Sequence, residues 1–81
     1  MENWTYRLKN PTTRFDVIEV LGVTAKSRRM RIRAENGEER DVWMSKRRTA
    51  FYTYTENGAT RMEIMVPDWL AVKTGLMEAT A

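Results

Sequence analysis

Apolar and polar residues alternate along much of the chain, and this period of two predicts strands rather than helices. The segment 14–25 is rich in β-branched residues, and its apolar side chains occupy both alternating sets. Gly22 interrupts this segment, which predicts a strand that is bulged or bent at the glycine. A further alternation over residues 5–8, within 1–10, predicts an edge strand before Asn10-Pro11 turns the chain.

The first of two predicted hairpins spans Arg28–Met44. Three apolar residues of the segment 28–34 alternate strictly with three arginines, which is typical of a half-buried strand: Met30, Ile32 and Ala34 against Arg29, Arg31 and Arg33. Asn36-Gly37 follows, which is a strong short-range hairpin signal, and residues 40–44 then alternate again.

The second predicted hairpin is built around Asn57-Gly58. An aromatic and β-branched strand over residues 50–55 precedes this pair, and a return strand over residues 59–66 follows it. Pro67 ends the return strand, because proline has no N–H to donate to a sheet.

A short helix is predicted to close the domain. Asp68 is a suitable N-cap for residues 69–74. Gly75 followed by Leu76 is typical of a helix stop with an apolar contact back to the helix. The last residues, 77–81, are expected to be frayed.

Five or six short strands that end in one short helix predict a mainly β fold. We expect a small antiparallel, strongly bent sheet or an SH3- or OB-like barrel. An open antiparallel sheet with the helix across one face is the alternative. A chain of 81 residues allows one core, so we expect residues 1–81 to form a single domain. The protein is expected to be a monomer or a small homo-oligomer, in which an unpaired edge at residues 5–8 or 59–66 could join a partner's sheet.

The composition excludes several classes of site. The chain contains no histidine and no cysteine, so disulfides, thiolate or imidazole zinc sites and Ser-His or Cys-His relays are absent. Ser45-Lys46 are sequence neighbours whose side chains diverge on an extended chain, and the carboxylates near Asn36-Gly37 are flanked by competing arginines. We therefore expect a binding protein rather than an enzyme, with no catalytic residue, metal or cofactor.

The same composition indicates no association with a membrane. No apolar run approaches the roughly 20 residues that cross a bilayer, and residues 1–10 lack the apolar stretch of a secretory signal. We therefore expect a cytoplasmic protein that does not bind membranes.

Positive charge is concentrated in one part of the chain. The net formal charge is +3, yet residues 26–48 hold nine basic and only four acidic residues. Most of these bases are arginines, whose planar donors suit phosphate and base stacking. On one strand face, alternate arginines would lie about 6.5 to 7 Å apart, close to the phosphate spacing of a nucleic-acid strand. In the alternative interpretation, three acidic residues across the hairpin form ion pairs with them: Glu38, Glu39 and Asp41.

The connector Lys46-Arg47-Arg48 has no acidic residue in the four positions before it or the seven after it, so it is a candidate contact for an anionic partner. Aromatic side chains beside such cations could stack on bases. The candidates are Tyr6, Trp43, Tyr52 and Tyr54, of which Tyr52 and Tyr54 share one strand face, and a tryptophan such as Trp43 is more often buried than exposed. The remaining tryptophans and the phenylalanines are assigned to the core: Trp4, Trp69, Phe15 and Phe51. The candidate binding residues are Arg29, Arg31, Arg33, Lys46, Arg47, Arg48, Tyr52 and Tyr54.

Two segments resemble a pattern found in small proteins of bacteriophages and prophages. Val42-Trp43-Met44-Ser45-Lys46 is similar to the family's Trp-Leu-Pro-Lys-Ser, although Ser45 replaces its proline and Arg47 its serine. Residues 67–76 are similar to its Pro-x-Trp-Leu-Ala-x-x-x-Gly-Leu. The family is mostly without an assigned function, so the resemblance implies a viral origin, a small β-rich fold and the cytoplasm of a bacterial host. We interpret the second segment as a structural plug, in which Trp69 and Leu70 insert into an open end of the barrel.

These observations lead to three functional hypotheses. The first is a non-enzymatic phage-type accessory protein whose basic hairpin face contacts nucleic acid or a nucleoprotein, mainly through phosphate. The second is a stoichiometric inhibitor of a host defence complex, of the anti-CRISPR type. The third is sequestration of a small nucleotide, which requires arginine and aromatic side chains that converge on a concavity.

Overall fold

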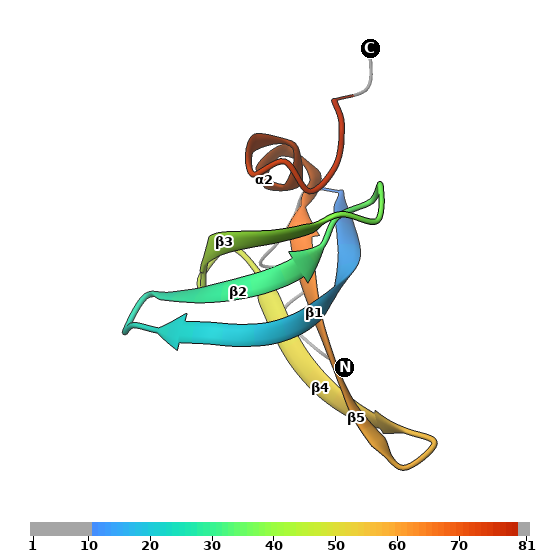
Figure 1. Ribbon diagram of the computed structural model, residues 1–81. Helices are drawn as coiled ribbons and strands as arrows, with labels where there is room; N and C mark the ends of the chain where they lie inside the picture. Colours follow the sequence, from blue (N-terminus) through green and yellow to red (C-terminus); the bar gives the residue numbers. More distant parts are fainter. Residues whose placement is uncertain (1–10, 80–81) are drawn as a thin grey trace.

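The computed structural model describes residues 11–79, which form five strands and one short helix (Figure 1). The elements are β1 (Thr12–Val23), β2 (Ser27–Arg33), β3 (Glu39–Ser45), β4 (Ala50–Glu56), β5 (Ala59–Pro67) and α2 (Asp68–Lys73). The edge strand predicted for residues 5–8 lies outside the described residues, as do residues 80 and 81 of the C-terminal tail.

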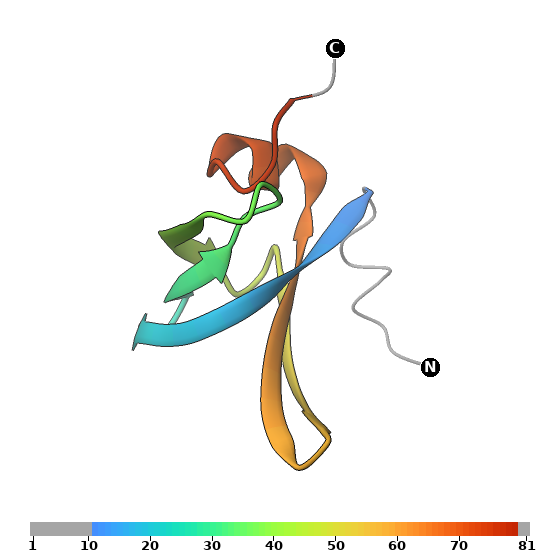
Figure 2. The ribbon, with the colours of Figure 1, turned by 45° about the vertical axis from the view of Figure 1, so that its right-hand side comes forward.

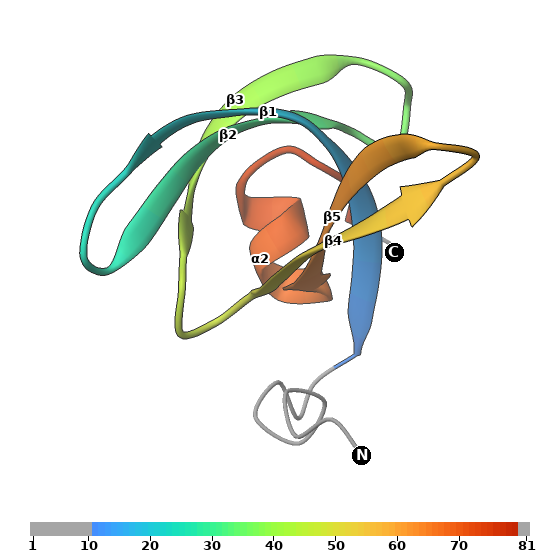
Figure 3. The ribbon, with the colours of Figure 1, turned by 90° about the horizontal axis from the view of Figure 1, so that it is seen from below.

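All five strands belong to one antiparallel sheet with the order β3-β2-β1-β5-β4. The 12-residue strand β1 is shared, because its first half pairs with β5 and its second half pairs with β2. The sheet bends along this strand (Figure 2) and curves around α2 when seen from below (Figure 3). The predicted mainly β fold with a short C-terminal helix is therefore confirmed, and the sheet stays open between β3 and β4 rather than closing into a barrel.

Two irregularities in β1 explain how one strand serves both halves of the sheet. Its register with β2 shifts between Val17 and Glu19 and again between Val20 and Gly22. Each shift inserts one extra residue into β1, and such bulges bend a strand and increase its twist. After each extra residue, the side chains that follow point to the opposite face from the one that the alternation would give them. This explains why apolar residues of β1 occupy both alternating sets. The irregularity predicted at Gly22 is confirmed, and the one after Val17 is additional.

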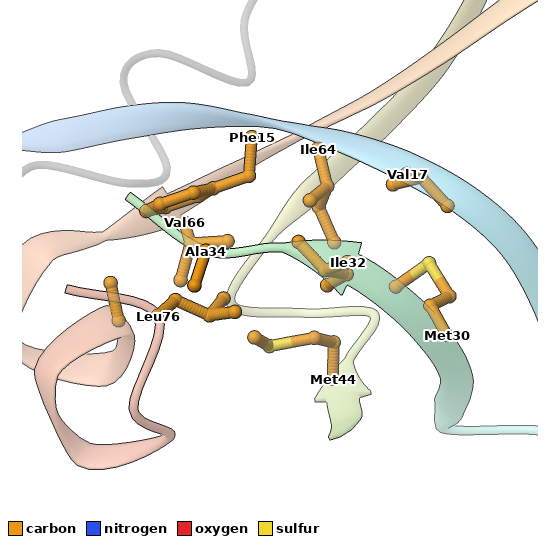
Figure 4. Close-up of a cluster of buried hydrophobic side chains, with 10 residues drawn as sticks. Phe15, Val17, Met30, Ile32, Ala34, Met44, Ile64, Val66 and Leu76 are labelled. Atoms are coloured by element: carbon orange, nitrogen blue, oxygen red, sulfur yellow. The ribbon is translucent and has the colours of Figure 1, made fainter. Parts of the chain in front are cut away.

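The core fills the concave side of this bent sheet. Side chains from both halves of the sheet meet there, with Leu76 beneath them (Figure 4). The buried apolar residues are Phe15, Val17, Met30, Ile32, Ala34, Met44, Ile64, Val66, Ala71 and Leu76. The alternation that assigned Met30, Ile32 and Ala34 to the core side of their strand is confirmed.

Both Asn-Gly pairs form turns, and β2 pairs with β3 as β4 pairs with β5. Asn57 and Gly58 have φ values of 52° and 80°, and positive φ at both central residues matches the type I′ turn that suits a two-residue hairpin. Contrary to expectation, β5 is not an edge strand, because it lies between β1 and β4. Among residues 11–79, the strands at the edges of the sheet are β3 and β4.

The end of α2 has the hydrogen bonds of a Schellman motif. The Leu76 N–H donates to the Ala71 carbonyl over 2.8 Å, and the Gly75 N–H donates to the Val72 carbonyl over 3.1 Å. Gly75 has a φ of 82°, a left-handed conformation that glycine adopts without strain. The motif turns the chain so that Leu76 is fully buried, and Met77 also packs against the core. The predicted helix stop is therefore confirmed.

The beginning of α2 differs from the prediction at two residues. Pro67, not Asp68, occupies the N-cap position, and the Asp68 carboxylate instead accepts a hydrogen bond of 2.8 Å from the Thr13 hydroxyl on β1. Trp69 is not a core plug, because 44% of it is exposed. Ala71 is the buried residue of this short helix, and a residue two positions away points to the opposite side.

Replacing Gly75 with alanine tests the helix stop. We expect Gly75→Ala to lower the free energy of unfolding by about 1 kcal/mol, because alanine is strained in the left-handed conformation. Gly22→Ala is the matched control, since a Cβ there would meet Arg29 Cβ at 3.9 Å, an ordinary contact, and Gly22 has no positive φ. Urea denaturation of both variants measures the difference. Equal stability of the two variants would show that the stop does not depend on the conformation of Gly75.

Candidate functional site

All three arginines predicted on the hairpin face form ion pairs with the opposite strand, and the pairs of Arg31 and Arg33 are the closer ones. Arg31 Nε and Nη2 donate to the two carboxylate oxygens of Asp41 over 2.8 and 3.3 Å, and Glu19 lies 3.7 Å from Arg31 Nη1. Arg33 lies 3.6 Å from Glu39. The strand register places Asp41 directly opposite Arg31 and Glu39 directly opposite Arg33. For these two arginines, the structure agrees with the interpretation of a solvated face with cross-strand pairs.

The Arg31–Asp41 contact alters both ionisation equilibria. The hydrogen bond from Arg31 holds the pKa of Asp41 below its ordinary value, and the same bond raises the pKa of Arg31. Glu38, the third acidic residue of the hairpin, pairs with Arg40 over 3.2 Å rather than with the arginine row. A phosphate would therefore have to displace a carboxylate to bind Arg31 or Arg33.

Arg29 differs from the other two residues of the row. Its closest carboxylate, that of Asp41, lies 3.9 Å away and already accepts two hydrogen bonds from Arg31. Arg29 pairs across the strands with Trp43, which is 54% exposed on the edge strand β3. Of the row, Arg29 is therefore the residue that lies nearest the connector and is least neutralised.

The connector between β3 and β4 is a turn held by hydrogen bonds. The Thr49 hydroxyl donates to the Ser45 carbonyl over 2.6 Å, and the Arg47 N–H donates to the Ser45 hydroxyl over 3.2 Å. The Lys46 N–H donates to the Lys26 carbonyl over 2.9 Å, which fixes the connector beside the turn between β1 and β2. Thr49 is buried, so its polar group needs this partner.

Five cations gather at this end of the sheet: Lys26, Arg28, Lys46, Arg47 and Arg48, here called the basic end. Within residues 11–79, none of the five forms an ion pair with a carboxylate. Two of them lie over aromatic rings, Arg28 at 4.9 Å from the Phe51 ring centre and Arg48 at 5.7 Å from that of Trp69. The basic end therefore combines unneutralised positive charge with aromatic surface.

Tyr52 and Tyr54 contact an acidic residue instead of this cluster. Their hydroxyls donate to the two oxygens of Glu63 over 2.6 and 3.1 Å, and their ring centres lie 6.4 Å apart. The Tyr52 hydroxyl, with smaller help from Tyr54, holds the pKa of Glu63 below its ordinary value. Burial, followed by Glu63, raises the pKa of Tyr52, and the bond to Glu63 raises that of Tyr54. A carboxylate at this position disfavours a nearby phosphate.

One hollow of about 220 Å³ lies where the beginning of β1 separates from the end of β2. Its lining is Thr13, Arg14, Phe15, Asp16, Arg33, Ala34, Glu35 and Glu63. The lining contains two arginines and one aromatic residue, but Arg33 is paired with Glu39 and Phe15 is buried in the core. The three acidic residues of the lining would repel the phosphate of a nucleotide. The described hollow gives no support to the sequestration hypothesis.

The predicted binding residues thus occupy three different environments, and only the connector contributes to the basic end. Two cations that the fold brings next to the connector, Lys26 and Arg28, were not among the predicted binding residues. Trp69 was assigned to the core, and Trp43 was a candidate for base stacking that was expected to be buried more often than exposed; both are exposed. The alternation of β3 did place Trp43 on the same face as Asp41, opposite the core residue Met44, so a signal for its exposure was present.

Comparisons with family models, curated proteins and solved structures found no match to the chain. In the part of the chain that the structure describes, no helix has the length and apolar character needed to cross a membrane. The resemblance to phage proteins therefore stays a prediction from the two sequence segments.

Substitution of Glu63 tests the tyrosine–carboxylate contact. The pKa of Glu63 is lowered from its ordinary value of 4.5, so the ionised carboxylate stabilises the folded state at pH values above 4.5. This stabilisation is lost as the pH falls through the lower pKa that Glu63 has in the folded protein. We expect Glu63→Gln to have a lower free energy of unfolding than wild type at about pH 7, and we expect this difference to become smaller towards about pH 3. Urea denaturation across this range measures the gap.

Glu56→Gln is the control, because Glu56 is exposed and its pair with Arg61 spans 3.5 Å between exposed side chains. We expect it to change stability little at neutral pH. A gap between wild type and Glu63→Gln that does not change with pH would contradict the role of the ionised carboxylate.

Proposed function

We propose that this protein is a non-enzymatic accessory protein that binds nucleic acid through the phosphate backbone at the basic end. The observation that carries the proposal is the gathering of Lys26, Arg28 and the three connector cations without carboxylate partners among residues 11–79. Positive charge that is concentrated on one part of a surface is the electrostatic pattern of phosphate binding.

The contrast with the hairpin face supports this location. Arg31 and Arg33 could bind phosphate only by giving up Asp41 and Glu39, whereas the connector cations meet no such competition. The hydrogen bonds from Thr49 and Lys46 hold the connector backbone in one conformation. A preorganised backbone reduces the entropy lost on binding, which favours this turn over a flexible basic tail.

The proposed binding is electrostatic and has little dependence on sequence. A handful of phosphate contacts releases a similar number of counterions, so the affinity falls as salt rises, with a slope of about −0.7 per contact on single strands. The modest net charge of +3 is consistent with a short contact of this kind rather than with wrapping of a long duplex.

A protein partner is the second candidate, and the open sheet favours it. The edge strands β3 and β4 have no neighbour on their outer sides within residues 11–79. Such edges can accept a strand from another protein. An inhibitor of a host defence complex would use this mode, and a phage or prophage origin fits either function.

Binding of labelled oligonucleotides tests the proposal and separates the two candidates. Fluorescence anisotropy with single-stranded and duplex DNA and RNA at about 50 and 200 mM salt is expected to show binding that weakens as salt rises. We expect Arg47→Gln/Arg48→Gln to weaken binding about tenfold at the lower salt and to reduce the salt slope by about 1.4, the value for two lost contacts.

Arg33→Gln/Arg61→Gln is the matched control, because it removes the same charge from two arginines that form ion pairs with Glu39 and Glu56. The control is expected to bind nearly as well as wild type. An equal loss in both variants would mean that net charge, not the basic end, governs binding. No binding of any oligonucleotide at low salt would overturn the proposal and direct the search to a protein partner.

A further inference from the structure

Trp69 is an exposed aromatic residue that does not belong to the hydrophobic core. It lies in the first turn of α2, opposite the buried Ala71, and 44% of it is exposed. An exposed tryptophan at a helix surface leaves a large apolar ring in water. Its position beside the connector places it at the edge of the basic end, where Arg48 lies over the ring at 5.7 Å.

A second cation lies near the same ring. Lys73 follows Trp69 by four residues in α2, and residues with this spacing are neighbours on one face of a helix, about 5 to 6 Å apart at Cβ. Both Arg48 and Lys73 are exposed, and neither forms an ion pair within residues 11–79. The nearby Asp68 carboxylate accepts a hydrogen bond from Thr13, which holds it towards β1.

We infer that Trp69 is a stacking platform for one base of a single-stranded nucleic acid, with Arg48 and Lys73 as contacts for the phosphates on either side. This inference rests on the proposed function and names its ligand more closely. A base can lie flat on an indole ring only if it has left its pairing partner and its stacked neighbours, so a duplex cannot use this platform. Stacking of this kind depends little on sequence, because every base has a flat face.

Trp43 is the natural comparison. It is exposed to a similar degree, but it lies on the face of β3 that also carries the Asp41 carboxylate, and no cation of residues 11–79 lies over its ring. Phosphates that flank a base on Trp43 would approach this negative charge. We therefore assign the stacking role to Trp69 and not to Trp43.

An abasic oligonucleotide separates stacking from phosphate binding. A labelled 12-nucleotide oligothymidylate, an abasic strand of about the same length and a duplex are each titrated with wild type, Trp69→Leu and Trp43→Leu, using anisotropy at about 50 mM salt. Wild type and Trp43→Leu are expected to prefer the oligothymidylate over the abasic strand by about tenfold, the effect of one stacked base. Trp69→Leu is expected to lose this preference and to keep its salt-dependent affinity for the abasic strand.

A second measurement does not depend on how well Trp69→Leu folds. The chain has three tryptophans, so Trp4→Phe/Trp43→Phe leaves Trp69 as the sole indole. Its fluorescence is expected to be quenched by oligothymidylate and much less by the abasic strand. Equal binding of both strands by wild type, or an unchanged preference in Trp69→Leu, would overturn the stacking role and leave the proposed function intact. Absence of binding to all three probes would overturn both.

Discussion

The division of β1 between two partners is the constraint on which the rest of this structure depends. Residues 12–16 pair with β5, and the segment from Val17 onward pairs with β2, so one strand carries both halves of the sheet. The two bulges let it bend without breaking its pairing, and the core fills the resulting concavity. Leu76, turned inward by the Schellman motif, covers the remaining side. A straight β1 would leave the two halves in one flat sheet with no shared interior.

The same bend determines where charge gathers. It brings the end of β3 near the beginning of β4, although these strands lie at opposite edges of the sheet. The connector between them is therefore a short turn, and it lies beside the turn of residues 24–26. The connector cations therefore lie next to Lys26 and Arg28. Cross-strand pairing within the hairpin neutralises Arg31 and Arg33 instead. Basic residues that are close in sequence thus fall into two electrostatic environments, and among residues 11–79 only the cations of the basic end have no carboxylate partner.

Local patterns in the sequence predicted the strands, both hairpins, the helix stop and most of the core, because each depends on residues a few positions apart. The second bulge in β1 and the order of the strands could not be predicted in this way, since both depend on distant pairing. The candidate site was predicted less well for the same reason. Tyr52 and Tyr54 contact Glu63 on the neighbouring strand, and the exposure of Trp69 follows from how a very short helix meets the sheet. The alternation of apolar and polar residues alone predicts neither the contacts with Glu63 nor the exposure of Trp69.

Chemical-shift mapping by NMR tests the central claim most directly. Nitrogen-15-labelled protein is titrated with an unlabelled oligothymidylate at about 50 mM salt, where electrostatic binding is strongest. The proposed function and the stacking role of Trp69 predict that the largest changes occur at the amides of residues 46–49 and at the indole N–H of Trp69, with little change at Arg31, Tyr52 or Tyr54. Changes concentrated on the arginine row or around Glu63 would contradict this account, as would a titration that changes no signal.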